Sequence, residues 1–149
     1  MPSKVNWSYL AGIIDGEGCI CITKSETRQR NKGWRDKPPL FYLQYQMYVQ
    51  ATNTNLVLMK WLVQTFGGDY HITYPEDVVK NHKARYEWSP KGNAHKKTVL
   101  LSILPYLVLK NEQAKLGLAY IDLGYGKQTE RECLLQRMKV LNKRGIPND

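Results

Sequence analysis

The sequence has few cysteines, few acidic residues and no long apolar run. An odd number of cysteines, with no pair at the spacing of zinc ligands, argues against a disulfide framework and a zinc site; they are Cys19, Cys21 and Cys133. Without a long apolar run or a basic amphipathic anchor, we expect no membrane partner. The N-terminus lacks the apolar core of a signal peptide, so we expect an intracellular protein.

Basic residues outnumber acidic ones. Lys and Arg number 22 against 13 Asp and Glu, which gives a net charge of +9. This excess favours a polyanionic partner, and nucleic acid is the first candidate. The length of 149 residues is typical of one domain that buries its own core. We therefore expect a single domain over 1–149, with 124–149 as its C-terminal helical extension.

Hydrophobic periodicity predicts an α+β fold. Asn6 or Ser8 is expected to cap the first helix, and Asn53 to open the second. The expected elements, in chain order, are a helix at about 6–15, strands at 18–25 and 40–52, a helix at 54–66, strands at 69–75 and 83–89, and helices at 93–104, 110–123 and 128–143.

The clearest alternation lies in residues 40–52, LFYLQYQMYVQAT. A half-buried strand explains this spacing, because successive side chains point to opposite faces. The apolar face consists of Leu43, Tyr45, Met47, Val49 and Ala51. The other face carries only amides and phenols, which form hydrogen bonds but have no charge: Tyr42, Gln44, Gln46, Tyr48 and Gln50.

Two acids stand at an unusual place in the stretch WSYLAGIIDGEGCICI, residues 7–22. Asp15 and Glu17 lie at the C-terminal end of the expected helix, where the helix macrodipole is negative. Gly12 and Gly16 share one face of that helix, and each costs the helix about 1 kcal/mol relative to Ala. Close packing against another backbone, such as a second copy of this helix, would explain both glycines.

Such packing would bring acids of two chains together. Like charges at close range are costly unless a cation lies between them, and carboxylate oxygens suit Mg²⁺ or Ca²⁺. A basic protein whose carboxylates converge on a divalent ion has the design of a metal-dependent nuclease. The alternative interpretation is that Asp15 and Glu17 are turn residues, with Asp15 bonding nearby backbone.

The segment LAGIIDGEG, residues 10–18, resembles the signature of the LAGLIDADG homing endonucleases. Ile13 and Glu17 are like-for-like changes within that signature. The expected element order is similar to the αββαββα core of the family. A second segment, LPYLVLKNEQA at 104–114, resembles the family's stretch that delivers an active-site lysine at the start of a late helix.

The resemblance implies roles for particular residues. The turn formed by Asp15, Gly16 and Glu17 is the expected metal site, in which Glu17 holds the catalytic metal and Asp15 holds the helix end. Lys110 is expected to stabilise charge near the scissile phosphate. A polar group at the end of the second strand positions water in this family. Gln50 and Asn53 are both candidates, although an ungapped alignment places Ala51 there.

The resemblance also implies a saddle-shaped antiparallel sheet whose outward residues bind double-stranded DNA. Gln suits adenine and Arg suits guanine in the major groove, while basic residues of the turn at 24–37 suit phosphates. The expected DNA-binding residues are Cys21, Thr23, Ser25, Thr27, Arg28, Arg30, Lys32, Arg35, Tyr42, Gln44, Gln46, Tyr48, Gln50, His71, Thr73, Lys83, Arg85 and Glu87.

A single copy of the motif implies a homodimer with the first helix at its two-fold axis, and therefore a near-palindromic DNA site. The expected interface residues are Tyr9, Gly12, Ile13 and Gly16. The implied reaction is Mg²⁺-dependent hydrolysis of one phosphodiester in each strand, leaving short 3′ overhangs. We expect Mn²⁺ to replace Mg²⁺ actively and Ca²⁺ to bind without cleavage.

Two other functions stay open at this level. Some relatives are maturases, which bind intron RNA and help it splice, and they keep the motif helix because it builds the fold. A DNA-binding protein that no longer cleaves is also possible, although it would be expected to lack the acid that stands at Glu17. Genes of this family are mobile and often intron-encoded, and the sequence does not reveal the target or the host.

Overall fold

The computed structural model describes residues 1–29, 40–124 and 126–143. The α+β class and the predicted order of elements are confirmed. Its helices are α1 (Lys4–Glu17), α2 (Leu56–Phe66), α3 (Gly92–Ile103), α4 (Asn111–Asp122) and α5 (Gln128–Leu141), with a 3₁₀ turn at Leu104–Tyr106. Its strands are β1 (Gly18–Gln29), β2 (Leu40–Asn53), β3 (Asp69–Tyr74) and β4 (Arg85–Ser89).

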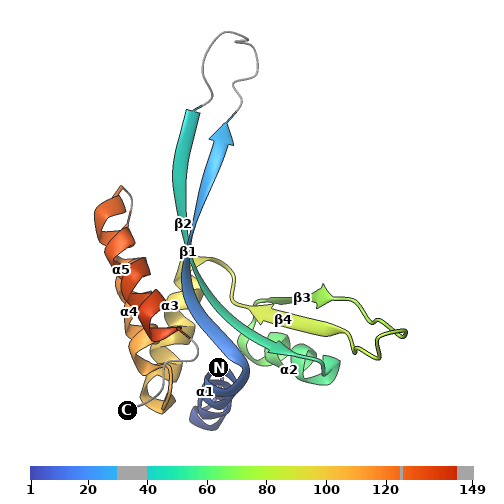
Figure 1. The fold of residues 1–149 in the computed structure, drawn as a ribbon. Coiled ribbons are helices and arrows are strands. Elements are labelled where there is room, and N and C mark those ends of the chain that lie inside the picture. The colour runs from blue at the N-terminus through green and yellow to red at the C-terminus, as the bar shows by residue number, and fades with distance from the viewer. Residues whose placement is uncertain (30–39, 125, 144–149) are drawn as a thin grey trace, which may run out of the picture.

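The strands form one antiparallel sheet in the order β1-β2-β4-β3. β1 pairs with β2 along its whole length, from Gly18 opposite Ala51 to Gln29 opposite Leu40. β4 joins β2 only at residues 51–53. The paired β1 and β2, called here the ribbon, therefore extend far beyond β3 and β4, and the two arms of the sheet point in different directions (Figure 1).

The helices pack on one side of the sheet. α3, α4 and α5 lie together beside the ribbon, and α1 and α2 lie where the two arms of the sheet meet (Figure 1). The apolar face predicted for 40–52 is confirmed from Tyr45 to Ala51, whereas Leu43 is 42% exposed. One hydrophobic cluster connects these strands with all five helices, and its fully buried side chains include Leu10, Ile14, Ile20, Met47, Met59, Trp88, Leu100 and Leu135.

Gly18 joins α1 directly to β1. Its backbone angle, φ of −101°, is accessible to any residue. A Cβ atom added there would lie 2.6 Å from the Ile14 Cα and 2.8 Å from the Gln50 carbonyl oxygen. Glycine is therefore required by space rather than by φ, and it lets the helix end meet the end of β2.

Three local expectations are wrong. Ser3 caps α1 by accepting from the Asn6 N–H, because Ser8 lies inside the helix and its hydroxyl bonds the Lys4 carbonyl. Asn55, not Asn53, caps α2, since Asn53 still pairs with β4 as the last residue of β2. Lys83 precedes β4, in a connection closed by a bridge between residues 77 and 82.

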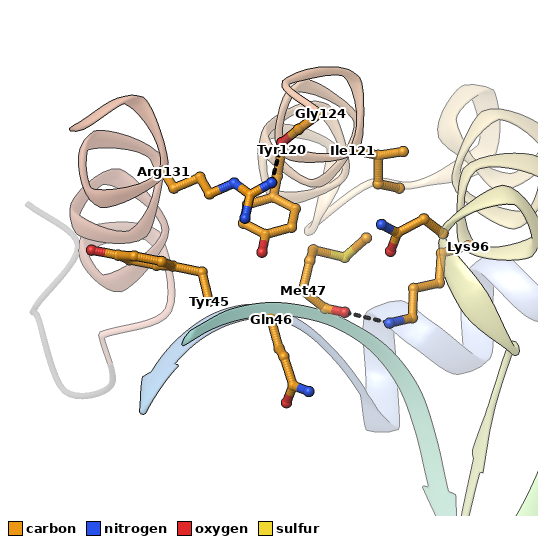
Figure 2. A pocket seen from close by; sticks show the side chains of 9 residues that line it. Tyr45, Gln46, Met47, Lys96, Tyr120, Ile121, Gly124 and Arg131 are labelled. Atoms are coloured by element: carbon orange, nitrogen blue, oxygen red, sulfur yellow. Dashed lines mark hydrogen bonds between the residues drawn. The ribbon is translucent and has the colours of Figure 1, made fainter. Parts of the chain in front are cut away.

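The edge of β2 that faces away from β1 is open beyond β4. Lys96 of α3 donates to the Met47 carbonyl at 2.7 Å and so satisfies one acceptor of this edge (Figure 2). Burial lowers the pKa of Lys96. Lys96 also lines a pocket of about 330 Å³ (Figure 2). The Tyr120 ring of α4 bounds this pocket, and the Arg131 guanidinium lies 5.2 Å from the centre of that ring.

No helix in the described part of the chain is long and apolar enough to cross a membrane.

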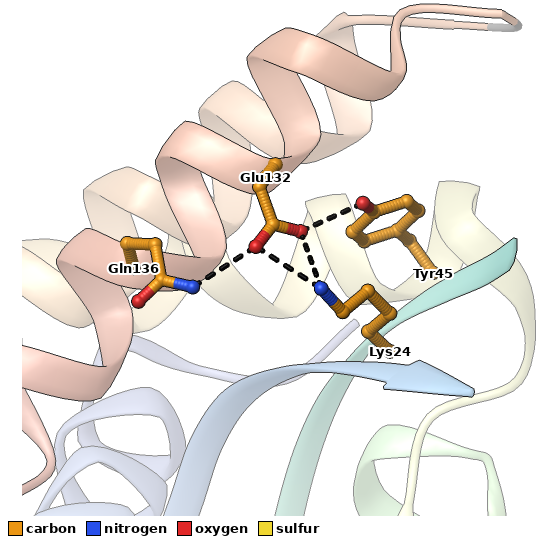
Figure 3. A network of polar contacts seen from close by, with 4 residues as sticks. All are labelled: Lys24, Tyr45, Glu132 and Gln136. Atoms are coloured by element: carbon orange, nitrogen blue, oxygen red, sulfur yellow. Dashed lines mark hydrogen bonds and ion pairs between the residues drawn. The ribbon is translucent and has the colours of Figure 1, made fainter. Parts of the chain in front are cut away.

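Farther along the ribbon, α5 is attached to both strands through Glu132 (Figure 3). Its carboxylate accepts from the Tyr45 hydroxyl at 2.7 Å and from Lys24 at 3.1 Å, and Gln136 donates to it from the next turn of α5 at 2.9 Å. The bond from Tyr45, followed by those from Gln136 and Lys24, lowers the pKa of Glu132 to about 2. Glu132 therefore fixes the ribbon relative to the helices.

This attachment predicts a pH-dependent stability. The contacts that lower the pKa of Glu132 stabilise the folded state, and this contribution is complete at pH values above the ordinary carboxyl pKa near 4.5. It disappears as the pH falls towards 2. We expect Glu132→Gln to melt at a lower temperature than the wild type at pH 6, and the difference to shrink at pH 3. Circular dichroism melts at both pH values measure it.

The matched control is Glu112→Gln, which removes an exposed ion pair to Lys115 within α4. That pair joins no two elements and is expected to contribute little. A Glu132→Gln melting difference that stays equal at both pH values, or that is matched by Glu112→Gln, would contradict the attachment.

Candidate functional site

Glu17 is exposed at the C-terminal end of α1, beside the last residues of β2. Its Oε2 accepts a 2.6 Å hydrogen bond from the Asn53 amide. The side-chain oxygen of Asn53, Oδ1, accepts from the Asn55 backbone N–H at 2.8 Å. The side-chain nitrogen, Nδ2, is therefore the group that faces Glu17. The cleft here has a volume of about 450 Å³ and is lined by Glu17, Gly18, Cys19, Thr52, Asn53, Thr54 and Arg85.

Asp15 has a different environment from Glu17, two residues away. Its carboxylate accepts from three consecutive backbone N–H groups, those of Val108 at 2.7 Å, Leu109 at 3.2 Å and Lys110 at 3.0 Å. These bonds hold the segment before α4 against the end of α1. The arrangement agrees with a structural role for Asp15 rather than direct contact with a metal.

Lys110 also connects the two segments, because its side chain bonds back to the end of α1. Its ammonium group donates to the carbonyls of Ile14 at 2.8 Å and Asp15 at 2.7 Å. These are carbonyls of the last turn of α1, where a positive charge also compensates the negative end of the helix macrodipole. Lys110 therefore stands at the start of α4 as predicted, and its charge lies at the helix end that carries Glu17. Its role at a phosphate stays a prediction.

The strand side chains on the polar side of the ribbon are uncharged. The register pairs Cys21 with Tyr48, Thr23 with Gln46, Ser25 with Gln44 and Thr27 with Tyr42. The Tyr48 hydroxyl donates to the side-chain oxygen of Gln46, and the Lys96 ammonium group of α3 lies 5.6 Å from the centre of the Tyr48 ring. Most of these strand side chains are exposed. The predicted faces of both strands are therefore present, and they lie side by side.

The cysteines are not paired in a disulfide. Cys19 and Cys21 are half-buried on the polar side of β1. A hydrogen bond with Cys19 and burial raise the pKa of the Cys21 thiol, which keeps it protonated. A redox or metal-binding thiolate is therefore not favoured at Cys21.

A second cluster of polar side chains lies where β2 meets β4 and β3, and it consists of Gln50, Glu87 and His71. Gln50 donates to Glu87 at 2.7 Å, and His71 lies 3.6 Å from the same carboxylate oxygen. The register between β3 and β4 shifts after Ile72, so that Tyr74 rather than Thr73 is paired with Arg85.

This shift makes Tyr74 a surface residue that the alternation of the sequence did not reveal. Its ring lies 5.5 Å from the Arg85 guanidinium. The Thr73 hydroxyl donates to the Arg85 carbonyl. Of the basic residues assigned to phosphate contacts, Arg28 lies on β1 above the Phe41 ring, whereas Arg30, Lys32 and Arg35 lie outside the described residues.

The exposed face of α1 forms a groove of about 470 Å³ with α2 and the end of β2. A Cβ atom added at Gly12 or Gly16 would meet nothing within 4 Å. The neighbouring Tyr9 is 56% exposed and contacts only the edge of Trp61 among the described aromatic rings. The four residues expected at a dimer interface therefore share one accessible surface, which is continuous with Glu17.

No group of three or more His, Cys, Asp or Glu side chains in the described residues could hold a metal ion. Glu17 contributes one carboxylate next to one amide donor. Its carboxylate is a suitable hard ligand for Mg²⁺ or Ca²⁺, but one chain supplies too few acids for a complete site.

Comparison with solved structures shows that the fold of the chain is similar to that of several homing endonucleases. It aligns with I-CvuI over 98% of its own length and 87% of that chain, with a TM-score of 0.68 and 21% identity. The archaeal intron-encoded I-Vdi141I gives a TM-score of 0.68 at 13% identity, over 97% and 89% of the two chains. I-TnaI gives a TM-score of 0.64 at 18% identity, over 97% and 92%. No curated protein matches the sequence significantly.

The fold is thus that of a homing endonuclease. Glu17 is exposed at the end of its first helix, and the helices pack on only one side of its sheet. The family model for the LAGLIDADG endonucleases matches residues 10–122. The chain belongs to the LAGLIDADG endonuclease family.

The different environments of the two acids predict different effects of neutralising each one. Asp15→Asn retains one carbonyl oxygen but turns an amide donor towards backbone N–H groups, so we expect the free energy of unfolding to fall by about 2 kcal/mol. Glu17→Gln keeps an acceptor for Asn53 and should leave stability nearly unchanged. Denaturant unfolding of both variants measures this, and equal losses would contradict the assigned roles.

Proposed function

We propose that the chain is a DNA endonuclease that works as a homodimer with divalent metal ions and cuts both strands of a long, near-palindromic site. The observation that carries this proposal is the position of Glu17. It is presented at the end of α1, oriented by Asn53, between the accessible face of α1 and the polar side of the sheet.

The donor set supports a metal site only when two chains combine. Glu17 from each subunit, with the carbonyl of Gly16 close by, would hold Mg²⁺ through hard oxygen ligands. When bound, the metal would supply a Lewis acid for the phosphate and lower the pKa of water. Asn53 donates a hydrogen bond to Glu17, whereas Gln50 donates to Glu87. Asn53 is therefore the better candidate for positioning water.

A homodimer is supported by the face of α1. Gly12 and Gly16 leave open space that the backbone of a second copy can approach. The same face forms a groove with α2 and the end of β2, and Tyr9 is 56% exposed beside it.

Double-stranded DNA is supported as the partner by the charge of +9 and by the uncharged polar ribbon. The structures of I-CvuI and I-Vdi141I contain DNA. In this proposal the ribbon lies in the major groove, one half-site is bound by each subunit, and the cuts leave short 3′ overhangs.

Cleavage of a DNA library with randomised palindromic half-sites tests the activity. We expect cutting by the wild type with Mg²⁺ or Mn²⁺, and none with Ca²⁺ or EDTA. Cutting by Glu17→Gln should be at least about a hundredfold slower, because loss of a metal ligand should cost more than the roughly 10–100-fold typical of groups that only orient such ligands. Sequencing the product ends gives the overhang.

Glu112→Gln serves as the control for surface charge, and a melting curve of each variant as the control for folding. Enrichment of a bound site without any cutting in Mg²⁺ or Mn²⁺ would overturn the endonuclease proposal. A maturase and a DNA-binding protein that no longer cleaves would then remain, and binding of intron RNA would be tested to distinguish them.

The dimer has its own test. Gly12→Leu places a bulky side chain in space that is empty in one chain, so the monomer should fold, whereas the approach of a second helix is blocked. We expect a dimer mass for the wild type and a monomer mass for Gly12→Leu by sedimentation equilibrium. Ala119→Leu, on the exposed face of α4, is the matched control and should remain dimeric. A dimeric Gly12→Leu would show that this face is not the interface.

A further inference from the structure

The polar side of the sheet contains an acid where its neighbours are neutral or basic. Glu87 of β4 is paired with Thr52 of β2 and His71 of β3, and its side chain is only 19% exposed. Its neighbour in the chain, Trp88, is fully buried, which places the Glu87 carboxylate on the opposite, uncovered side of the sheet. Near a DNA backbone such a charge is unfavourable unless the carboxylate meets a hydrogen-bond donor.

The contact with Gln50 fixes the orientation of both groups. A carboxylate only accepts hydrogen bonds, so the 2.7 Å contact requires that the Gln50 amide nitrogen, and not its carbonyl oxygen, faces Glu87. One amide hydrogen is used there, and the second remains available. Both contacts of the carboxylate, those to Gln50 and His71, are made to Oε1, and the described residues make none to Oε2.

We infer that Glu87 and Gln50 together recognise a C·G base pair at one position of each DNA half-site. This inference rests on the proposed function. The two side chains present an acceptor beside a donor. A C·G pair presents the complement in the major groove, where the cytosine N4 amino group donates next to the guanine O6 acceptor. The carboxylate accepts from N4 and the Gln50 amide donates to O6.

The other base pairs fit less well. Exocyclic amino groups of cytosine and adenine are the donors of the major groove, so a guanine or thymine facing Glu87 would place its keto oxygen against the carboxylate. An A·T pair offers the same donor beside an acceptor, the adenine amino group next to the thymine O4. Adenine also places its N7 lone pair next to the amino group, where it repels the carboxylate, whereas cytosine has a C–H at the neighbouring position. The order of preference is therefore cytosine, then adenine, then guanine and thymine.

The position of this base pair follows from the register. Gln50 lies opposite Cys19, which lines the same cleft as Glu17. The recognised pair therefore lies in the inner part of the half-site, on the side of the cleavage position, and not beneath the distal part of the ribbon. Gln44 and Ser25, farther out along the ribbon, contact other positions.

Binding rather than cleavage should be measured, in Ca²⁺, with a pool of randomised palindromic half-sites. We expect the wild type to enrich cytosine at one inner position of each half-site, with about tenfold tighter binding than to thymine there. Glu87→Met, which is similar in length but removes the acceptor oxygens, should lose that preference at that position only. Gln44→Ala is the control and should alter an outer position while leaving the inner cytosine enriched.

A base analogue tests the inference on the wild type, without depending on a variant. Replacing the inner cytosine by 2-pyrimidinone removes the N4 amino group. We expect about tenfold weaker binding by the wild type and a clearly smaller loss by Glu87→Met, because that variant has already lost the acceptor for N4.

The outcomes separate the two proposals. If the wild type enriches no DNA sequence, the proposed function fails. If a sequence is enriched but no inner cytosine is required, or if Glu87→Met retains the cytosine preference and the full loss with 2-pyrimidinone, the recognition by Glu87 and Gln50 is wrong. Melting curves for each variant establish that the binding losses do not reflect unfolding.

Discussion

The reciprocal contact between the end of α1 and the start of α4 is the constraint on which the site depends. The Asp15 carboxylate accepts from backbone N–H groups that are more than 90 residues away in the chain, and Lys110 donates back to carbonyls of α1. Each segment satisfies groups that the other leaves without partners, because a helix end exposes carbonyls and the loop before α4 exposes N–H groups. The turn that carries Glu17 is therefore held from two sides.

The sheet is built with one side for the core and one side for a ligand. All five helices pack on the first side, and the ribbon extends beyond the area that they cover (Figure 1). Such an extension needs lateral support, which Glu132 supplies from α5 and Lys96 supplies at the open edge of β2. The polar side is then free to carry amides and hydroxyls, whose hydrogen bonds can distinguish bases without the cost of burying charge.

The same geometry brings chemistry and recognition close together. Gly18 allows α1 to meet the end of β2, where Asn53 contacts Glu17, while Gln50, three residues earlier, is bonded to Glu87. Both acids are thus oriented by amides of a single strand. Their environments differ, since Glu17 is exposed towards the face of α1 and Glu87 is half-buried within the sheet. One position suits a metal and the other a base edge.

The sequence alone determined the elements, their order and the two faces of each ribbon strand, because the spacing of apolar residues is local and directly reports burial. The motif at 10–18 also located Glu17 and the family. Only the tertiary structure decided which groups meet: Asn53 at Glu17, backbone N–H groups at Asp15, Lys110 at the carbonyls of α1, and Gln50 at Glu87. It also moved Tyr74 beside Arg85. These contacts depend on strand register and on packing between distant segments, and no local pattern of residues encodes either of them.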